Sequence, residues 1–217
     1  MKIKCFPFGP LQANAYLVTF GKDAFLIDPC VRMDHIDLDG AHIRGIFLTH
    51  GHYDHLTEAN TFRHLSGAVV MAHELECSNI LSGNTSSPFP QIANVSVDPP
   101  ICALKDGDIL RPVDFDINVS EDIEIRVIHT PGHSKGSMCL LVSETSRETK
   151  TQVLFSGDTL FADTIGRTDL DGSMEEMLHS LLKLSRLPDE VIVYPGHGPA
   201  TTIGREKRQN PYFTAIL

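Results

Sequence analysis

The sequence predicts an α/β fold in which two β-sheets pack face to face with helices outside. Strand-length apolar segments bounded by Gly, Pro and Asp alternate with a few helical patterns. The two halves of the chain also follow the same order, with several strands, then a helix, and a histidine-bearing loop after a strand. Of the 217 residues, 41% are hydrophobic and 21% charged, a balance typical of a globular core. We expect one domain over residues 1–217, because this length suits one large α/β domain.

Short strands dominate the first half. Strands are expected at residues 2–8, 15–20, 24–28, 43–49 and 68–72. Turn residues such as Gly9-Pro10, Gly21-Lys22 and Asp28-Pro29 separate the first of them. Helical spacing predicts helices over residues 55–65 and 73–81, which end at Gly67 and Gly83.

The second half repeats this pattern with a clearer helix. Strands are expected at residues 123–129, 138–142, 152–155 and 191–194, with a polar hairpin loop over 143–150. A helix is expected over residues 173–184, where Ser173 and Glu176 form a capping box. Its apolar stripe consists of Met177, Leu178, Leu181, Leu182 and Leu184.

Residues 83–100 have the chemistry of a long loop, rich in Ser, Asn, Gly and Pro. A loop of this length in a compact domain is often a lid or a binding segment, and the alternative is a tolerated surface insertion. If the segment is a lid, Phe89 is the side chain expected to contact a ligand.

Charge and cysteine content limit the possible partners and the compartment. The net charge is −10, which argues against nucleic acid and anionic membrane surfaces as partners and favours a small-molecule substrate. Five widely spaced cysteines without a C-x-x-C motif indicate a reducing compartment. The sequence shows no signal peptide and no apolar run near 18 residues, so a cytoplasmic location is expected. The oligomeric state is not predicted.

The segment from Thr49 to His55, Thr-His-Gly-His-Tyr-Asp-His, is the main candidate for chemistry. It follows a buried strand, and side chains two apart on a strand share a face, so His50 and His52 can converge on one ion. Asp54 and His55 follow where the chain turns into a helix and can serve a neighbouring position. Imidazole and carboxylate together suit zinc, iron or manganese.

Three further groups that can bind a metal follow later strands. His133, Asp158 and His197 each come directly after a glycine at the end of a strand. Each is a weak signal alone, but together with the first cluster they offer five histidines and two aspartates, which matches a two-metal site. Two metals about 3.5–4 Å apart can share an activated water.

These residues, in this order, resemble the metallo-β-lactamase superfamily across essentially the whole chain. The resemblance implies an αββα four-layer sandwich. It also implies a first metal bound by His50, His52 and His133, a second bound by Asp54, His55 and His197, and Asp158 as the bridging ligand. The Asp28-Pro29 turn is similar to the usual Asp-Pro-Gly turn of the family, with Cys30 in place of the glycine.

Within the superfamily, residues 157–161 and 165–170 are similar to glyoxalase II-like hydrolases. This implies hydrolysis of a thioester such as a hydroxyacyl-glutathione by a metal-bridging hydroxide, which Asp54 and Asp158 orient. Arg167 and Tyr53 are the expected substrate contacts, although Arg167 could instead pair with Asp169. Only residues 198–217 follow the last ligand, so we expect the short branch without a C-terminal glutathione-binding helical domain.

Other functions remain open at this stage. Persulfide dioxygenases also resemble this chain, including the stretch Gly166 to Asp169, and they would hold one iron with His50, His133 and Asp158. A lactonase, a β-lactamase or another metallo-hydrolase is a further alternative, as is a metal-binding protein without turnover. The expected cofactor is two divalent metal ions, most simply Zn²⁺, with iron or manganese as alternatives.

Overall fold

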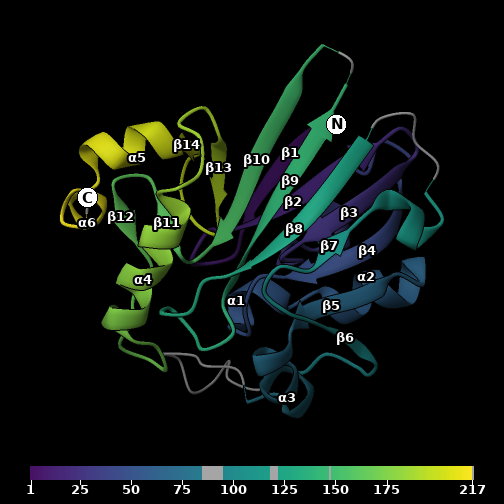
Figure 1. Cartoon of the computed structure of the whole chain (residues 1–217). Coiled ribbons are helices and arrows are strands. Elements are labelled where there is room, and N and C mark those ends of the chain that lie inside the picture. The colour runs from purple at the N-terminus through teal and green to yellow at the C-terminus, as the bar shows by residue number, and fades with distance from the viewer. Residues whose placement is uncertain (85–94, 118–121, 147, 217) are drawn as a thin grey trace. The chain divides into compact units, whose positions relative to one another are not determined.

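Figure 1 shows a computed structural model of the chain, which describes residues 1–84, 95–117, 122–146 and 148–216. The chain divides into two compact units, each with its own sheet. The first comprises Met1–Leu104 with Pro112–Val119, and the second comprises Lys105–Arg111 with Ser120–Leu217.

The first unit contains a six-stranded sheet in the order β1-β2-β3-β4-β5-β6, counted over the described residues. Its strands are β1 Lys2–Phe8, β2 Ala13–Phe20, β3 Asp23–Ile27, β4 His42–Leu48, β5 Val69–His73 and β6 Ile101–Leu104. Strands β1 to β3 pair antiparallel, whereas β3 to β6 pair parallel. Its helices are α1 Tyr53–Leu56, α2 Ala59–Ser66, α3 Glu74–Ser82 and the short 3₁₀ helices η1 Met33–His35 and η3 Pro112–Phe115.

Helices α2 and α3 cover one face of the sheet of this unit. Phe62 of α2 and Ile80 of α3 are fully buried and pack with the apolar side chains of β3, β4 and β5. The expected ends of α2 and α3 at Gly67 and Gly83 are confirmed.

One element of this unit differs from the prediction. The single helix expected over residues 55–65 is two helices, α1 and α2. The backbone N–H of Glu58 donates to the carbonyl of Pro29, and the Thr57 hydroxyl donates to the carbonyl of Cys30. A tertiary contact with the turn after β3 therefore replaces the helical hydrogen bond at this point.

The second unit contains a six-stranded sheet in the order β14-β13-β10-β9-β8-β7 and a small β11-β12 hairpin, again counted over the described residues. Its strands are β7 Ile109–Leu110, β8 Asp122–His129, β9 Met138–Thr145, β10 Lys150–Gly157, β11 Leu160–Phe161, β12 Thr164–Ile165, β13 Ile192–Pro195 and β14 Thr201–Thr202. Its helices are α4 Met174–Leu184, α5 Ile203–Gln209 and α6 Pro211–Thr214. Only β10 and β13 pair parallel.

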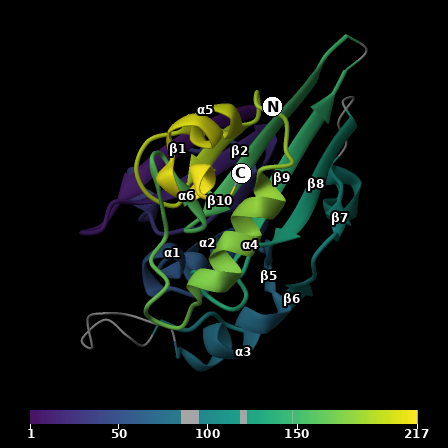
Figure 2. The same cartoon turned by 60° about the vertical axis from the view of Figure 1, so that its left-hand side comes forward.

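Helix α4 packs on the sheet of this unit as its sequence pattern predicts (Figure 2). Met177, Leu181 and Leu184 are fully buried against residues of β8, β9 and β10. The Ser173 hydroxyl accepts a hydrogen bond from the Glu176 backbone N–H, which confirms the predicted cap. Leu182, which the pattern placed in the same stripe, is exposed.

The polar hairpin loop expected over residues 143–150 is shorter than predicted. Strand β9 continues to Thr145 and β10 begins at Lys150, and these two residues pair directly. Their polar side chains face solvent at the end of a ladder, so the lack of hydrophobic alternation marks exposure rather than a loop.

The C-terminal segment is held in place by one buried carboxylate. Glu206 of α5 is fully buried and accepts hydrogen bonds from the Asp163 N–H, the Asn210 amide, the Thr201 hydroxyl and the Arg205 guanidinium. It thus ties α5 to the β11-β12 turn and to β14. The basic side chains of the same helix pair with carboxylates of the unit, for example Lys207 with Asp189.

The loop over residues 83–100 is described only in part. Residues 85–94 lie outside the described residues, and so does Phe89. Beyond this gap Val97 is buried, its N–H donates to the Ile80 carbonyl, and the Asn60 amide bonds the Ser96 carbonyl. The predicted lid therefore stays a prediction. Among the residues that the structure describes, no helix has the length and apolarity to cross a bilayer.

Candidate metal centre

The first ligand set consists of His50, His52, Asp54 and His55, on the loop after β4 and the first turn of α1. The three histidines are buried, with relative exposures of 1%, 6% and 0%. The His50 ring centroid lies 4.7 Å from that of His52 and 4.3 Å from that of His55. One Asp54 carboxylate oxygen lies 3.7 Å from His55 Nε2. The structure thus brings the four predicted side chains of this unit together.

Asp28 orients two of these histidines. It follows β3, and the parallel pairing of β3 with β4 places it beside the first ligand set, with its N–H donating to the Phe47 carbonyl at 2.9 Å. One carboxylate oxygen accepts the Thr49 N–H at 2.8 Å. The other accepts the Thr49 hydroxyl at 2.7 Å and lies 3.1 Å from His55 Nδ1. Asp28 is buried at 2% exposure, so these contacts are screened little by solvent.

These contacts fix the tautomers of His50 and His55. The Thr49 hydroxyl has one proton and donates it to Asp28, so it accepts at its 3.0 Å contact with His50 Nδ1. Nδ1 of His50 therefore carries the proton, and Nδ1 of His55 carries a proton that it donates to Asp28. Both rings present the lone pair of Nε2 to a metal, the arrangement usual for metal-bound histidine.

Asp28, His50 and His55 also offer potential ligand atoms within 4.8 Å of one another. Both carboxylate oxygens of Asp28 already accept hydrogen bonds, and the atom of His55 that faces it is the protonated Nδ1. We therefore assign Asp28 as the orienting carboxylate and not as a ligand.

The second ligand set consists of His133, Asp158 and His197, all in the second unit. One carboxylate oxygen of Asp158, Oδ2, lies 3.4 Å from His133 Nε2 and 3.5 Å from His197 Nε2. His133 and Asp158 are buried, and the side chain of His197 is 24% exposed. The carboxylate stands between the two rings, as a bridging ligand requires.

Parallel pairing explains how Asp158 and His197 meet. Strands β10 and β13 are parallel neighbours, so their carboxyl ends lie at one edge of the sheet. The Gly196 N–H donates to the Gly157 carbonyl at 2.8 Å, which joins the two loops one residue before each ligand. The Phe161 ring then packs edge-on to His197 at 6.0 Å between centroids.

The backbone of Arg167 orients His133. His133 Nδ1 lies 2.7 Å from the Arg167 carbonyl oxygen, which can only accept, so Nδ1 carries the proton and Nε2 the lone pair. Gly166 permits this contact, because a Cβ at that position would lie 1.7 Å from the Asp158 carbonyl oxygen. The glycine at position 166 therefore has a structural reason in the site itself.

The donor chemistry of both sets fits divalent metal ions. Three histidines have Nε2 as the lone-pair nitrogen, and each set adds a carboxylate, Asp54 in the first and Asp158 in the second. Imidazole and carboxylate ligands suit zinc, iron and manganese.

Comparison with known proteins identifies the family. The family model of the metallo-beta-lactamase superfamily matches residues 8–197. The chain belongs to the metallo-β-lactamase superfamily. The sequence-based recognition of the family and of its α/β fold with two sheets is thus confirmed.

Relatives of three kinds are similar over their full length. The hydroxyacylglutathione hydrolase GloC of Haemophilus influenzae is 30% identical, with 99% of each chain covered. The solved structure of the B3 metallo-beta-lactamase BLEG-1 has a TM-score of 0.79 at 33% identity, covering 98% of this chain and 100% of that one. TTHA1623, solved in a di-iron-bound form, has a TM-score of 0.78 at 32% identity, covering 96% and 99%.

Cys30 lies in the turn after β3, at the position where the sequence analysis expected the glycine of an Asp-Pro-Gly turn. Cys30 is 4% exposed, and its thiol donates to the Ala13 carbonyl of β2 at 3.2 Å. Burial raises the pKa of the Cys30 thiol, so it stays protonated and able to donate. The cysteine therefore packs the turn against β2 beside the orienting Asp28.

The three predicted substrate contacts have different outcomes. The Arg167 guanidinium forms two hydrogen bonds to the Asp169 carboxylate, at 2.7 and 2.8 Å, which is the structural pairing weighed as the alternative. Tyr53 is 5% exposed and, with Asp54, lines a cavity of about 240 Å³ next to the turn between β1 and β2. Phe89 lies outside the described residues. Contact with a substrate stays a prediction for all three.

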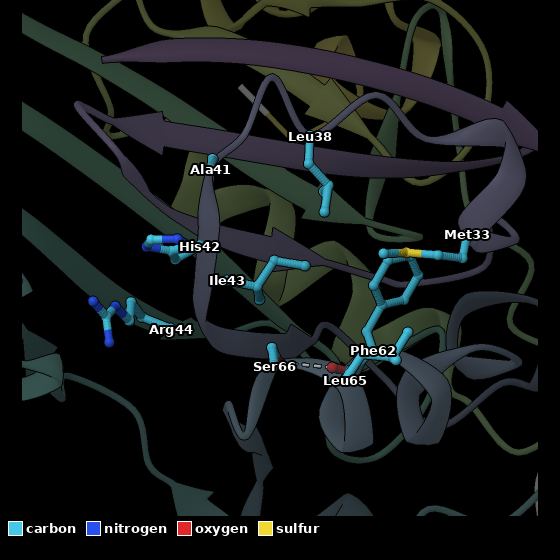
Figure 3. Close-up of a pocket in the computed structure, with 9 residues that line it drawn as sticks. All are labelled: Met33, Leu38, Ala41, His42, Ile43, Arg44, Phe62, Leu65 and Ser66. Carbon is cyan, nitrogen blue, oxygen red and sulfur yellow. Dashed lines mark hydrogen bonds between the residues drawn. The ribbon is translucent and has the colours of Figure 1, made fainter.

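A larger cavity of about 280 Å³ lies at the opposite end of β4 from the first ligand set (Figure 3). Met33, Leu38, Phe62 and Leu65 point into it, whereas Arg44 points away and donates to Asp23. None of the predicted site residues lines it. This cavity is therefore separate from the metal chemistry.

Sequence reasoning named the candidate ligands that the structure gathers into two sets, but not the groups that orient them. Asp28 was noted only as part of a family turn, and neither Thr49 nor the carbonyl of Arg167 was assigned a role. The available signal was the position of Asp28 at the end of a strand parallel to the ligand strand. Backbone acceptors leave no signal in a sequence.

Proposed function

We propose that this superfamily member is a metal-dependent thioesterase that hydrolyses hydroxyacyl thioesters such as hydroxyacyl-glutathione. The observation that carries the proposal is the oriented donor set, in which His50, His55 and His133 all have Nε2 as the lone-pair nitrogen. The full-length similarity to GloC, whose name states this activity, supports the substrate class.

The proposed site joins the two ligand sets, as the superfamily pattern implies. His50, His52 and His133 would bind one ion, and Asp54, His55 and His197 a second, with Asp158 shared. When bound, the two ions lower the pKa of a shared water and polarise the acyl oxygen. The preferred ion is Zn²⁺, and the di-iron form of TTHA1623 makes iron the first alternative.

The protein's own residues have distinct roles in this proposal. Asp158 and Asp54 keep carboxylate oxygens directed at the reacting water and hold its proton in place. Asp28, Thr49 and the Arg167 carbonyl fix the rings so that no imidazole must rotate or change tautomer when a metal binds. Preorganisation of this kind avoids a reorganisation cost in the transition state.

A second candidate function is β-lactam hydrolysis. It is favoured by the likeness to BLEG-1, which is at least as strong as the likeness to GloC. The third candidate, persulfide dioxygenation, rests on the stretch Gly166 to Asp169, and the His133-orienting role of that stretch would serve either chemistry.

The decisive experiment is hydrolysis of S-lactoylglutathione by the purified protein, with metal content measured, in the presence and absence of a chelator. Chelator-sensitive turnover that is restored by added Zn²⁺ or Fe²⁺ supports the proposal. His52→Ala and Asp158→Ala should abolish this turnover and lower the metal content.

Parallel assays separate the alternatives. Nitrocefin hydrolysis tests the β-lactamase hypothesis, and oxygen uptake with glutathione persulfide tests the dioxygenase hypothesis. A fully metallated protein that leaves S-lactoylglutathione intact but turns over one of these substrates would refute the thioesterase proposal.

A further inference from the structure

A second buried carboxylate lies against the metal-binding loop on the side of α3. Glu76 is only 3% exposed, in the first turn of that helix. A Cβ built on Gly51 would lie 2.5 Å from its Oε2 and 3.5 Å from its Cδ. The carboxylate thus fills the space that a side chain at position 51 would need.

Gly51 is the residue between two predicted ligands, His50 and His52. Contact of real Cβ atoms at 2.5 Å does not occur, so a side chain at position 51 would have to displace the Glu76 carboxylate, which is the mobile end of its side chain. The absence of a side chain at Gly51 is therefore what lets the carboxylate lie against the loop. The spacing of the two histidines and the position of Glu76 are coupled through this one contact.

The helix that carries Glu76 is firmly anchored. Its N-cap is His73, whose ring accepts from the Leu75 N–H at 3.4 Å and which is the last residue of β5. Ile80, one turn after Glu76, is fully buried in the core. Its Cγ1 would lie 3.4 Å from a Cβ built on Gly51. Glu76 is thus presented to the loop from a rigid element.

From these contacts we propose that Glu76 is a positioning residue of the metal centre, which holds the His50-Gly51-His52 backbone in place for metal binding. This inference rests on the proposed metal site and adds a group to it. Asp28 orients side chains of the loop, whereas Glu76 would hold the backbone of the loop. The carboxylate is buried against the loop that carries His50 and His52, so its charge would also favour binding of a cation there.

A structural role for Glu76 makes a different prediction. An acidic side chain in the first turn of a helix stabilises that helix through the helix dipole. Glu74, in the same turn but exposed, shares this effect. The pair Glu76→Gln and Glu74→Gln therefore separates the two roles while each removes one charge.

The test is the Zn²⁺ affinity of the purified full chain, measured by competition with a chromogenic chelator, together with the thermal midpoint of the metal-free protein. Glu76→Gln should weaken Zn²⁺ binding by about 10–100-fold, whereas Glu74→Gln should leave it within about threefold of wild type. Gly51→Ala should weaken binding at least as much. Adding Glu76→Ala to Gly51→Ala should then cost nothing further, because the clash is removed.

Two results would overturn the inference. One is wild-type Zn²⁺ affinity in Glu76→Gln, and the other is a lowered thermal midpoint of the metal-free variant with unchanged affinity. If Glu76→Gln does not fold, Glu76→Asp, which withdraws the carboxylate by one methylene, gives the same comparison. A wild-type protein that binds no Zn²⁺ or Fe²⁺ would instead refute the metal site itself.

Discussion

Replacing Asp28 with Asn should reverse the tautomers of His50 and His55, two of the proposed metal ligands. The backbone N–H of Thr49 always donates, so the amide oxygen of Asn must take the position that accepts it. The amide nitrogen then faces the Thr49 hydroxyl and His55 Nδ1 and donates to both. The Thr49 hydroxyl in turn donates to His50 Nδ1. Both rings would carry their proton on Nε2, the nitrogen that must bind the metal.

The size of the effect follows from the number of ligands changed. Loss of one orienting partner typically lowers metal affinity 10–100-fold. Because Asp28 controls His50 and His55 together, we expect about 10²–10⁴-fold weaker binding, or about 3–5 kcal/mol. Thr49→Val removes the partner of His50 alone and should cost about 10–100-fold. Asp28 has a φ of 49°, which Asn tolerates as well as Asp, so the substitution adds no backbone strain.

Two measurements test this prediction. Zn²⁺ affinity by chelator competition gives the free energies, and ¹H–¹⁵N spectra of the metal-free protein show which imidazole nitrogen is protonated. An Asp28→Asn variant that binds Zn²⁺ within threefold of wild type, or whose rings stay protonated on Nδ1, would refute the hydrogen-bond assignment.

Three further predictions concern other residues. The Arg167 guanidinium holds the pKa of the Asp169 carboxyl at about 2. The pair therefore stabilises the fold fully above the ordinary carboxyl pKa, and this stabilisation is lost as the pH falls towards 2. Arg167→Ala should return the midpoint of the Asp169 titration, followed by ¹³C NMR, to near 4, and a midpoint that stays near 2 would contradict the pairing. Burial raises the pKa of the Cys139 thiol to about 11. Cys139 should therefore resist a thiol reagent that modifies the exposed Cys102 at pH 8. Mass spectrometry of the labelled native protein measures both reactions. Glu206→Ala should lower the free energy of unfolding by about 3–5 kcal/mol, because it removes the acceptor of four buried hydrogen bonds; a loss below 1 kcal/mol in urea titration would show that the network contributes little.

Long elements with a regular hydrophobic pattern could be predicted from the sequence. The bounds of β1 match the prediction exactly as residues 2–8, and α4 differs only by its cap residue. The break between α1 and α2 could not be predicted, because it depends on the carbonyls of Pro29 and Cys30 far away in the sequence. The β11-β12 hairpin and β14 are too short for any periodicity to appear.

The grouping of the candidate ligands could be predicted because their spacing is a chemical pattern. His50 and His52 are two residues apart just after β4, Asp158 directly follows β10, and His197 lies two residues after β13. Their supporting groups were not predictable in the same way. The contact of Glu76 with Gly51 joins residues in different elements, and it appears only when α3 is packed on the sheet.

The orientation of His133 by a backbone carbonyl has a consequence for how this enzyme family can diversify. The identity of the Arg167 side chain does not affect that hydrogen bond, so mutation at position 167 can explore new substrate contacts without disturbing the metal ligand. Position 166 has no such freedom, because any side chain there would collide with the Asp158 carbonyl. Position 166 is thus constrained by backbone packing at the edge of the candidate site, whereas the side chain of its neighbour at 167 is not needed for the contact that orients His133.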